Sequence, residues 1–221
     1  MRRARLFPKL QQVDLSLGEV IYESGQSIEY IYFPVNCIIS LLSVTEDGSS
    51  AEISVVGRDG MAGVAVVLGG LSTPNRFVVQ SHGCAYRMSA SDLIAEFNSQ
   101  AEIRILTLRY TQALFAQMSQ TAVCNRHHSI DQQLCRWLLL SLDRLEDEHL
   151  NMTQELIANM LGVRREGVTQ AAGKLQKVGA IKYQRGHITV LDRAMLERLC
   201  CECYSVVRNE TDRLEARKTT Y

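Results

Sequence analysis

The sequence predicts an α+β protein with an N-terminal antiparallel β-barrel (jelly roll), a long helix, and a C-terminal domain of short helices with a β-hairpin. Three observations support this fold class. Short β-branched runs separated by turn residues fill residues 15–90, a pattern typical of sandwiches and barrels. No glycine or proline occurs from Ala101 to Val123, as expected for a long helix. Beyond that stretch, short helical periods end in two strand-like runs around an Arg-Gly pair.

The chain of 221 residues divides most simply into a barrel over residues 1–100, a linking helix over 101–124 and a C-terminal domain over 125–221. Its 46% hydrophobic and 22% charged residues are ordinary for a soluble globular protein. The longest apolar runs, Val64–Leu68 and Trp137–Leu140, are far shorter than the roughly 20 residues that cross a bilayer. No apolar signal-peptide core follows the N-terminus. We therefore expect a cytoplasmic protein without a membrane partner.

The barrel strands are expected where apolar and β-branched residues run between turn signals. Gly, Pro, Asn and Asp supply those signals, for example in Ser24-Gly25 and Glu46-Asp47-Gly48. The clearest strand candidates are Val20–Tyr22, Tyr30–Phe33, Ile38–Val44 and Ile53–Val56. A helix is expected to begin near Ser91.

The long helix carries apolar residues on more than one face, and both faces must be buried. One heptad seam along the helix is formed by Ile103, Leu106, Tyr110, Ala113 and Gln117. Other sides of the helix carry Leu108, Phe115 and Met118. We expect one face to cover the barrel and the seam to pair with the same helix of a second copy, giving a two-fold homodimer. The alternative is a core helix of a monomer.

The C-terminal domain begins after a break in the helical pattern at Asn125-Arg-His-His. Ser129 and Gln132 have the spacing of a capping box, which predicts a helix running to about Leu145. The hinge between the domains is therefore expected near residues 124–129.

A helix-turn-helix is predicted over Met152–Lys177. Thr153 precedes a short amphipathic helix, and Gly162 lies at the turn, where the backbone needs a positive φ. A second helix starts at about Arg164, and the small residues at 171–173 let it pack close to its neighbour.

The second helix has a polar N-terminal end, the arrangement by which a recognition helix reads base edges in the major groove. Arginine suits guanine, glutamate suits cytosine and glutamine suits adenine. The hairpin that follows is a candidate wing, and residues 152–190 hold six basic and only two acidic residues, as phosphate contact requires. We expect duplex DNA to be contacted by nine residues: Thr153, Arg164, Arg165, Glu166, Thr169, Gln170, Lys174, Lys182 and Arg185.

The run from Thr153 to Thr169 resembles the helix-turn-helix of the cyclic AMP receptor protein and fumarate/nitrate reduction regulator (Crp/Fnr) family, and the barrel pattern Gly18–Gly25 extends the resemblance over most of the chain. It implies a cyclic-nucleotide-binding-like barrel, a dimerisation helix and a winged helix-turn-helix. It also implies a homodimer on a pseudo-palindromic DNA site, with RNA polymerase as a possible partner. The family's base-reading Arg and Glu map onto Arg165 and Glu166. Its later base-contacting Arg falls on Gln170, which implies a different operator.

The barrel departs from the pattern of the cyclic-nucleotide binders that it resembles. Those members hold the ribose with a Gly-Glu pair and the cyclic phosphate with an Arg-Ser pair. Met61 stands where the glutamate is expected, and Pro74-Asn75 where Arg-Ser is expected. Arg76 is shifted by two positions. We therefore expect an effector pocket around Met61, Asn75 and Arg76, but no bound cyclic nucleotide and no other cofactor.

Seven cysteines are scattered along the chain, and in a reducing compartment most are expected to be packed free thiols. Two groups hold possible ligands: Cys200, Cys201 and Cys203, and Cys124 with His127 and His128. Adjacent cysteines on a helix point in different directions, and no standard zinc spacing is present, so we expect no metal. A thiol or metal redox sensor and a signalling module without DNA remain alternatives. No catalytic motif accompanies the histidines, and we expect no enzyme activity.

Overall fold

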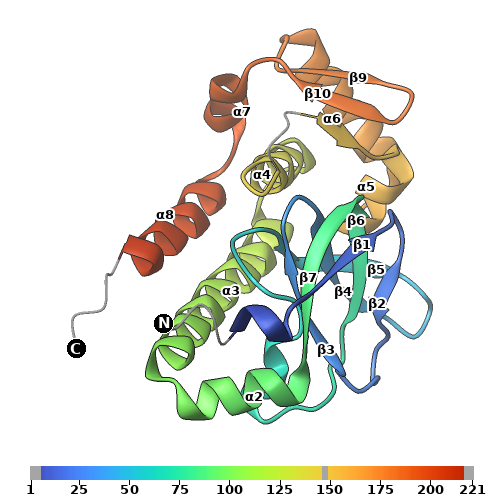
Figure 1. Cartoon of the computed structure of the whole chain (residues 1–221). Coiled ribbons are helices and arrows are strands. Elements are labelled where there is room, and N and C mark those ends of the chain that lie inside the picture. Colours follow the sequence, from blue (N-terminus) through green and yellow to red (C-terminus); the bar gives the residue numbers. More distant parts are fainter. Residues whose placement is uncertain (1–5, 146–148, 217–221) are drawn as a thin grey trace.

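The computed structural model describes residues 6–145 and 149–216 (Figure 1). The N-terminal elements are η1 (Phe7–Lys9), β1 (Gln11–Leu15), β2 (Val20–Tyr22), β3 (Tyr30–Pro34), β4 (Ile38–Val44), β5 (Ser50–Val56), η2 (Val64–Leu68), β6 (Arg76–Ser81) and β7 (Gly83–Ser89). The elements that follow are α2 (Ala90–Ser99), α3 (Ala101–His127), α4 (Ile130–Leu142), β8 (His149–Asn151), α5 (Gln154–Leu161), α6 (Arg165–Lys177), β9 (Ile181–Gln184), β10 (His187–Val190), α7 (Arg193–Leu199) and α8 (Glu202–Ala216).

The N-terminal strands form two antiparallel sheets with the orders β1-β7-β3 and β2-β6-β4-β5. The two sheets enclose an apolar core that includes Ile31, Ile39 and Val79, all of which are at most 1% exposed. The predicted jelly-roll architecture is confirmed, and the bounds predicted for β4 are those observed.

The helices that follow the barrel begin and end at different residues from those expected. The α2 cap is Ser89, whose hydroxyl accepts a hydrogen bond from the Asp92 amide at 3.1 Å, rather than Ser91. The expected break at residues 125–128 is corrected too, because α3 continues to His127 and only His128 is extended. Polar residues at a helix end do not by themselves stop the helix, and the chain turns where the next cap, Ser129, begins α4. The predicted capping box of Ser129 with Gln132 is confirmed.

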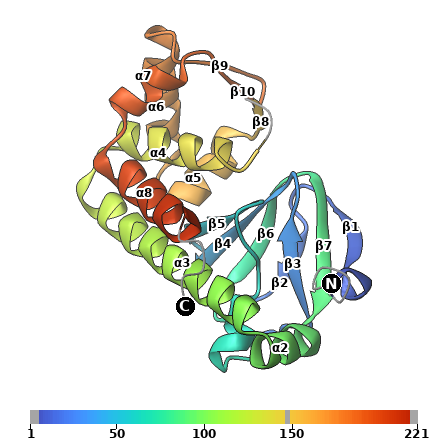
Figure 2. The same ribbon diagram turned by 60° about the vertical axis from the view of Figure 1, so that its left-hand side comes forward.

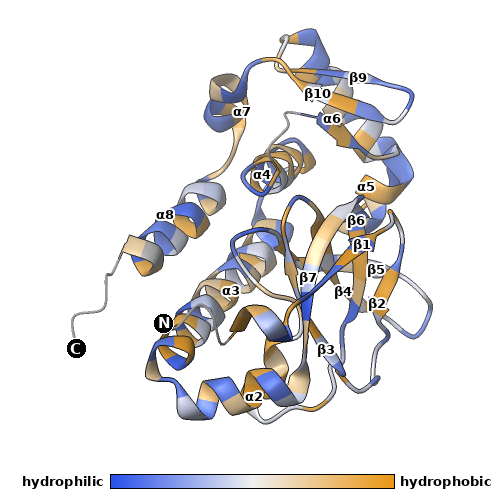
Figure 3. Ribbon diagram, in the orientation of Figure 1, coloured by the Kyte–Doolittle hydropathy of each residue, from blue (hydrophilic) through white to orange (hydrophobic). Residues whose placement is uncertain are grey.

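Helix α4 lies between the barrel and the C-terminal helices and is apolar around most of its circumference (Figure 3). A helix of this composition has to be buried on all sides. Every residue of α4 from Gln133 to Leu142 is buried. Its neighbours include Ile38, Leu42 and Val55 of the barrel, so the two domains share one apolar core.

A chain of buried polar side chains crosses the same contact. The Ser40 hydroxyl oxygen is 2.7 Å from Gln80 Oε1, and Gln80 Nε2 donates to the Ser141 hydroxyl of α4 at 3.2 Å. Glu52 extends this chain of polar side chains on the barrel side. Burial raises the pKa of its carboxyl to about 7. The network therefore connects the second sheet of the barrel to α4.

Helix α8 lies along α3, so the last described helix returns to the side of the barrel (Figure 2). Val207 and Leu214 of α8 are buried. Within residues 6–145 and 149–216, no helix combines the length and the apolar character needed to span a lipid bilayer.

Candidate nucleic-acid interface

Helices α5 and α6 form the predicted helix-turn-helix, and local sequence signals fix its turn. The Thr153 hydroxyl accepts a hydrogen bond from the Leu156 amide at 3.2 Å and so caps α5. Gly162 follows α5 with φ of 65°, the left-handed conformation that glycine adopts at low cost. Arg164 is the N-cap residue of α6, one position before the first helical residue, Arg165.

Close packing of α6 depends on a glycine other than the one expected. Val168, Ala171 and Ala172 are buried, as predicted. Gly173, however, is exposed, and a Cβ there would meet nothing within 4 Å. A Cβ on Gly167 would lie 2.7 Å from Ile130 Cδ1, so α6 lies close to the Ile130 side chain of α4 at Gly167.

The N-terminal end of α6 presents polar side chains to solvent. Arg164, Arg165, Glu166 and Gln170 are all exposed. Within the described residues, none of their side chains makes a hydrogen bond or an ion pair. Exposed groups without internal partners, at the positively polarised end of a helix, are free to contact an external polyanion.

Two residues that were predicted to contact DNA, Thr169 and Lys174, form side-chain contacts within the C-terminal domain. The Thr169 hydroxyl donates to Gln154 Oε1 at 2.7 Å and so ties α6 to α5. Lys174 Nζ lies 2.7 Å from Asp131 Oδ2 of α4. The Lys174 side chain is 66% exposed and the Asp131 side chain 37% exposed, so water screens this ion pair and it is weak. Lys174 is therefore directed toward α4 rather than along the base-reading end of α6.

The predicted wing is present, with an additional strand. Strands β9 and β10 pair across a turn in which Arg185 has φ of 51° and Gly186 φ of 83°, the two positive values of a type I′ hairpin. Strand β8, which has no clear pattern in the sequence, pairs with β10. The Tyr183 hydroxyl donates to the Met152 carbonyl at 2.8 Å and joins the wing to the start of α5. Lys182 and Arg185 are exposed beside this anchor.

A cavity lies where the effector pocket was expected, but Arg76 does not line it. A cavity of about 210 Å³ lies between the barrel and α3, and its lining includes Met61, Asn75, Phe77, Thr111, Phe115 and Met118. No charged residue is among the described residues that line it. Arg76 Nη2 instead lies 3.2 Å from Glu23 Oε1, outside the cavity. Because Arg76 stands two positions after the expected arginine, its side chain pairs with Glu23 and does not line the cavity.

Three residues of the predicted dimer seam face this chain's own barrel, which corrects their assignment, whereas Leu106 of the same seam is 60% exposed. Ile103 packs on the barrel core, and the Tyr110 hydroxyl donates to the Met61 carbonyl at 2.9 Å. Gln117 is buried beside Ser54. Leu106 and Ala113 line a groove with Leu214 of α8.

Four large apolar side chains of α3 are exposed: Leu106 at 60%, Leu108 at 48%, Phe115 at 57% and Val123 at 45%. Leu106 belongs to the predicted seam. The other three lie on a different side of the helix, where Phe115 also borders the barrel cavity. Periodicity shows that a helix has two apolar faces, but it does not say which of them meets the barrel.

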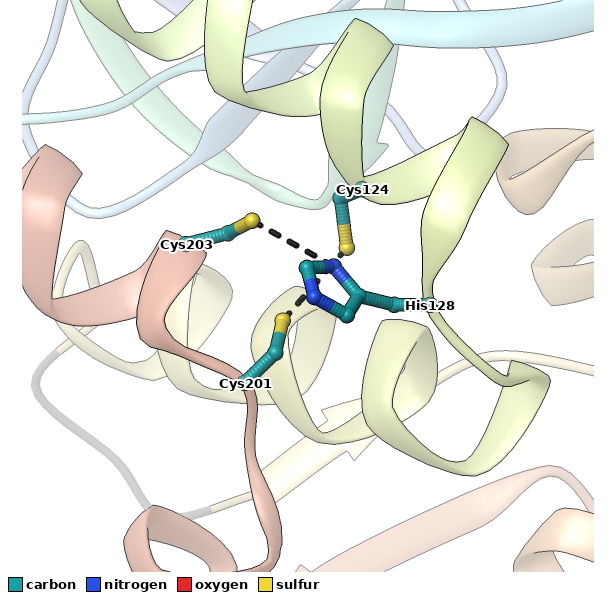
Figure 4. Close-up of side chains that lie close together, drawn as sticks. All are labelled: Cys124, His128, Cys201 and Cys203. Atoms are coloured by element: carbon teal, nitrogen blue, oxygen red, sulfur yellow. Dashed lines mark hydrogen bonds between the residues drawn. The ribbon is translucent and has the colours of Figure 1, made fainter.

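The cysteine and histidine groups that looked separate in the sequence meet at the end of α3 (Figure 4). Cys124 and His128 lie next to Cys201 and Cys203, whereas His127 is exposed and outside the group. The expectation that adjacent cysteines could not share a metal assumed one continuous helix. The helix is interrupted: α7 ends at Leu199 and α8 starts at Glu202. A Cys-x₃-His spacing at the end of α3 and a Cys-x-Cys spacing at the start of α8 were the available signals.

The two domains match separate family models. Residues 12–100 match the cyclic nucleotide-binding domain, and residues 132–199 match the Crp-like helix-turn-helix domain. The chain belongs to the Crp/Fnr family. Together the two matches cover more than two thirds of this Crp/Fnr protein, and they make it a transcription regulator with a DNA-binding helix-turn-helix. No curated protein matches its sequence significantly.

Solved structures of other regulators share the fold of this Crp/Fnr protein. FixK2 from Bradyrhizobium japonicum superposes with a TM-score of 0.75 at 16% identity, over 87% of this chain and 98% of its own. TTHA1359, a Crp/Fnr regulator from Thermus thermophilus, gives 0.68 at 20% identity, over 86% and 97%. The c-di-GMP-responsive regulator CLP from Xanthomonas campestris gives 0.67 at 12% identity, over 85% and 97%. At these identities the likeness concerns the fold alone.

Proposed function

We propose that this regulator reads a specific DNA sequence through the N-terminal end of α6. The observation that carries the proposal is the exposed, internally unpartnered group of Arg165, Glu166 and Gln170. Arginine can grip guanine O6 and N7 with two parallel hydrogen bonds, while glutamate accepts from cytosine N4 and glutamine pairs with adenine. Lys182 and Arg185 of the wing supply phosphate contacts that position the helix but read no sequence.

The proposed active form is a homodimer paired through the face of α3 that carries Leu108, Phe115 and Val123. Leu108 and Phe115 lie seven residues apart and therefore on the same side of the helix, and Val123 continues that side one further step. An apolar stripe on a long helix is unfavourable in water and is covered when two copies pair. A two-fold dimer would present two α6 helices to a pseudo-palindromic operator, one helical turn or a multiple of it apart. We place the protein in the cytoplasm, where the DNA lies. RNA polymerase is the proposed further partner.

The barrel is proposed to respond to a ligand other than a cyclic nucleotide. A cyclic phosphate placed in the cavity beside Met61 and Asn75 would meet no cationic side chain, and the nearby Arg76 is paired with Glu23. A desolvated phosphate without a charge-assisted partner binds poorly. Isothermal titration calorimetry with cyclic AMP, cyclic GMP and c-di-GMP is expected to show no heat of binding. Binding of any of them at micromolar concentration would contradict this part of the proposal.

DNA binding is tested by fluorescence anisotropy at about physiological salt. A labelled duplex from the region upstream of the protein's own gene is compared with a random duplex of the same length. Specific binding tighter than non-specific binding by about 10³-fold or more is expected. Equal affinities for upstream fragments of its own and neighbouring genes and for random DNA would contradict sequence-specific reading.

A further inference from the structure

Four potential metal ligands from two distant parts of the chain converge at the end of α3. Cys124 lies in the last turn of α3 and His128 directly follows the helix, while Cys201 and Cys203 flank the first residue of α8. Their three sulfur atoms and one ring nitrogen all lie within 4.8 Å of one another. Figure 4 shows the side chains pointing toward a common centre.

Two of the separations match the edges of a tetrahedral site. Cys124 Sγ is 3.6 Å from Cys201 Sγ, and Cys203 Sγ is 3.5 Å from His128 Nδ1. Zinc bonds of about 2.3 Å to sulfur and about 2.0 Å to nitrogen place two sulfurs about 3.8 Å apart, and a sulfur and a nitrogen about 3.5 Å apart, at tetrahedral angles. An iron–sulfur cluster would distribute its ligands over two or more iron atoms, so the compact set fits a single ion better.

The histidine is oriented as a metal ligand is. Its Nε2 lies 3.4 Å from Glu202 Oε1, which leaves Nδ1 directed at the sulfurs. A carboxylate on the far ring nitrogen fixes the tautomer and orientation of metal-bound histidines in general. Glu202 lies between Cys201 and Cys203 in sequence, so one short segment would supply two ligands and the carboxylate that orients a third.

Burial and charge also suit a thiolate-rich site. Cys124 and Cys203 are fully buried and Cys201 is 6% exposed. Three thiolates and a neutral imidazole on a divalent ion carry one net negative charge, which needs compensation in a buried place. Arg136 of α4 is 4% exposed and within electrostatic reach of Cys124.

Packing alone explains this arrangement less well. Buried cysteines do behave as small apolar groups, and three of them could form a minor satellite of the core. That explanation does not account for an imidazole nitrogen directed among the sulfurs and held there from behind by a carboxylate.

We propose that Cys124, His128, Cys201 and Cys203 bind one tetrahedral divalent ion, zinc or a zinc-like metal. The ion would join the end of α3 to the start of α8, at the hinge between the barrel and the DNA-binding domain. The site is independent of the barrel cavity and of the base-reading end of α6.

The test is a titration of the full-length, fully reduced, metal-free protein with Co²⁺, whose tetrahedral thiolate complexes absorb strongly in visible light. About one equivalent is expected to bind with intense d–d bands, and Zn²⁺ is expected to displace it. Cys201→Ser and Cys203→Ser are expected to abolish the bands or weaken binding at least tenfold. Glu202→Gln is expected to weaken binding by about 10–100-fold.

Matched controls use cysteines outside the set. Cys84→Ser and Cys37→Ser, both in the barrel, are expected to bind Co²⁺ as the wild type does. Circular dichroism of each metal-free variant reports whether it folds, and Glu202→Gln, which leaves all four ligands in place, provides a test if a cysteine variant does not fold. The proposal is overturned if the reduced wild type binds no Co²⁺, or if Cys201→Ser binds it unchanged. Isolation of the protein with two or more irons per chain, or with a Cys124–Cys201 disulfide and no metal affinity, would overturn it as well.

Discussion

The Ser40 hydroxyl oxygen lies 2.6 Å from Glu52 Oε2 in the buried contact between the barrel and α4. Gln80 Oε1 lies 2.7 Å from the same hydroxyl. A hydroxyl has a single proton and cannot donate to both acceptors. A protonated Glu52 completes the network, because it donates to Ser40, and Ser40 then donates to Gln80. This protonation state agrees with the pKa of about 7 that burial gives the carboxyl.

Stability is therefore expected to fall as the pH rises through 7. The folded-state pKa of Glu52, about 7, is above the ordinary value of 4.5. The protonated carboxyl thus contributes stability that is fully present below the ordinary value and is lost as the pH rises through the folded-state value. Glu52→Gln, whose amide can donate to Ser40 permanently, should gain about 2–3 kcal/mol over the wild type in unfolding free energy between about pH 5 and about pH 8.

Urea unfolding at the two pH values measures this difference. Glu29→Gln removes the same charge from an exposed position and should track the wild type at both. A constant gap between Glu52→Gln and the wild type across the range would show that Glu52 is ionised in the folded protein.

Arg165 and Lys182 are expected to affect DNA binding in different ways. Arg165→Ala should weaken binding to the operator by about 1–3 kcal/mol and relax the preference for one base pair. Lys182→Ala should weaken binding to all sequences alike and reduce the salt dependence by about one counterion. Anisotropy titrations over a salt series measure both quantities, with Arg87→Ala in the barrel as the charge-matched control. Unchanged operator affinity in Arg165→Ala would exclude that base contact.

Two glycines of α6 are expected to respond oppositely to alanine. Gly173→Ala adds a methyl group into open space within a helix and should stabilise the protein by about 0.5–1 kcal/mol. Gly167→Ala places its Cβ 2.7 Å from Ile130 Cδ1, so α6 and α4 must shift or Ile130 must move.

Gly167→Ala should therefore be less stable than Gly173→Ala by at least about 1 kcal/mol. Thermal unfolding of both variants gives the comparison. Adding Ile130→Val, which removes the crowded methyl group, should reduce the loss. Equal stabilisation by both alanines would mean that the contact of α6 with α4 is loose.

Phe115→Glu is expected to convert a dimer into monomers. It places a charge on the exposed face of α3, where Phe115 is 57% exposed in the single chain, and charges buried on both sides of a two-fold interface repel each other. Sedimentation equilibrium measures the mass. Leu17→Glu alters a barrel leucine of similar exposure, 49%, and should leave the mass unchanged. If the wild type sediments as a monomer at micromolar concentration, pairing through α3 is ruled out at that concentration.

Local signals in the sequence predicted local structure well. Ser129 and Thr153 are caps, Gly162 has the expected positive φ, and the expected turn is present at Arg185-Gly186, because each feature depends on residues only a few positions apart. Strands β2 to β5 were readable in the same way, since alternation and turns are short-range properties, whereas β1, β6 and β7 were not singled out.

Features that depend on distant contacts could not be read in the same way. Tyr110 and Gln117 fit a dimer seam by period, yet they face the barrel, because only tertiary packing decides which side of α3 is covered. Strand β8 is too short to show a period and exists because β10 pairs with it. The cluster of cysteines with His128 could not be read for a third reason. Its two halves are brought together only because α8 folds back along α3.

That return has a mechanical consequence for the DNA-binding domain. Cys124 and Cys201 are 77 positions apart in sequence, yet their sulfurs are 3.6 Å apart. The polypeptide therefore enters and leaves the α4–α7 segment at one narrow neck, which is formed by the α3–α4 and α7–α8 connections. Because α4 and α5 also pack on the barrel, a swing of α6 relative to the barrel would have to break that packing as well as turn at this neck. A small rotation at the neck would therefore produce a larger displacement of the base-reading end of α6.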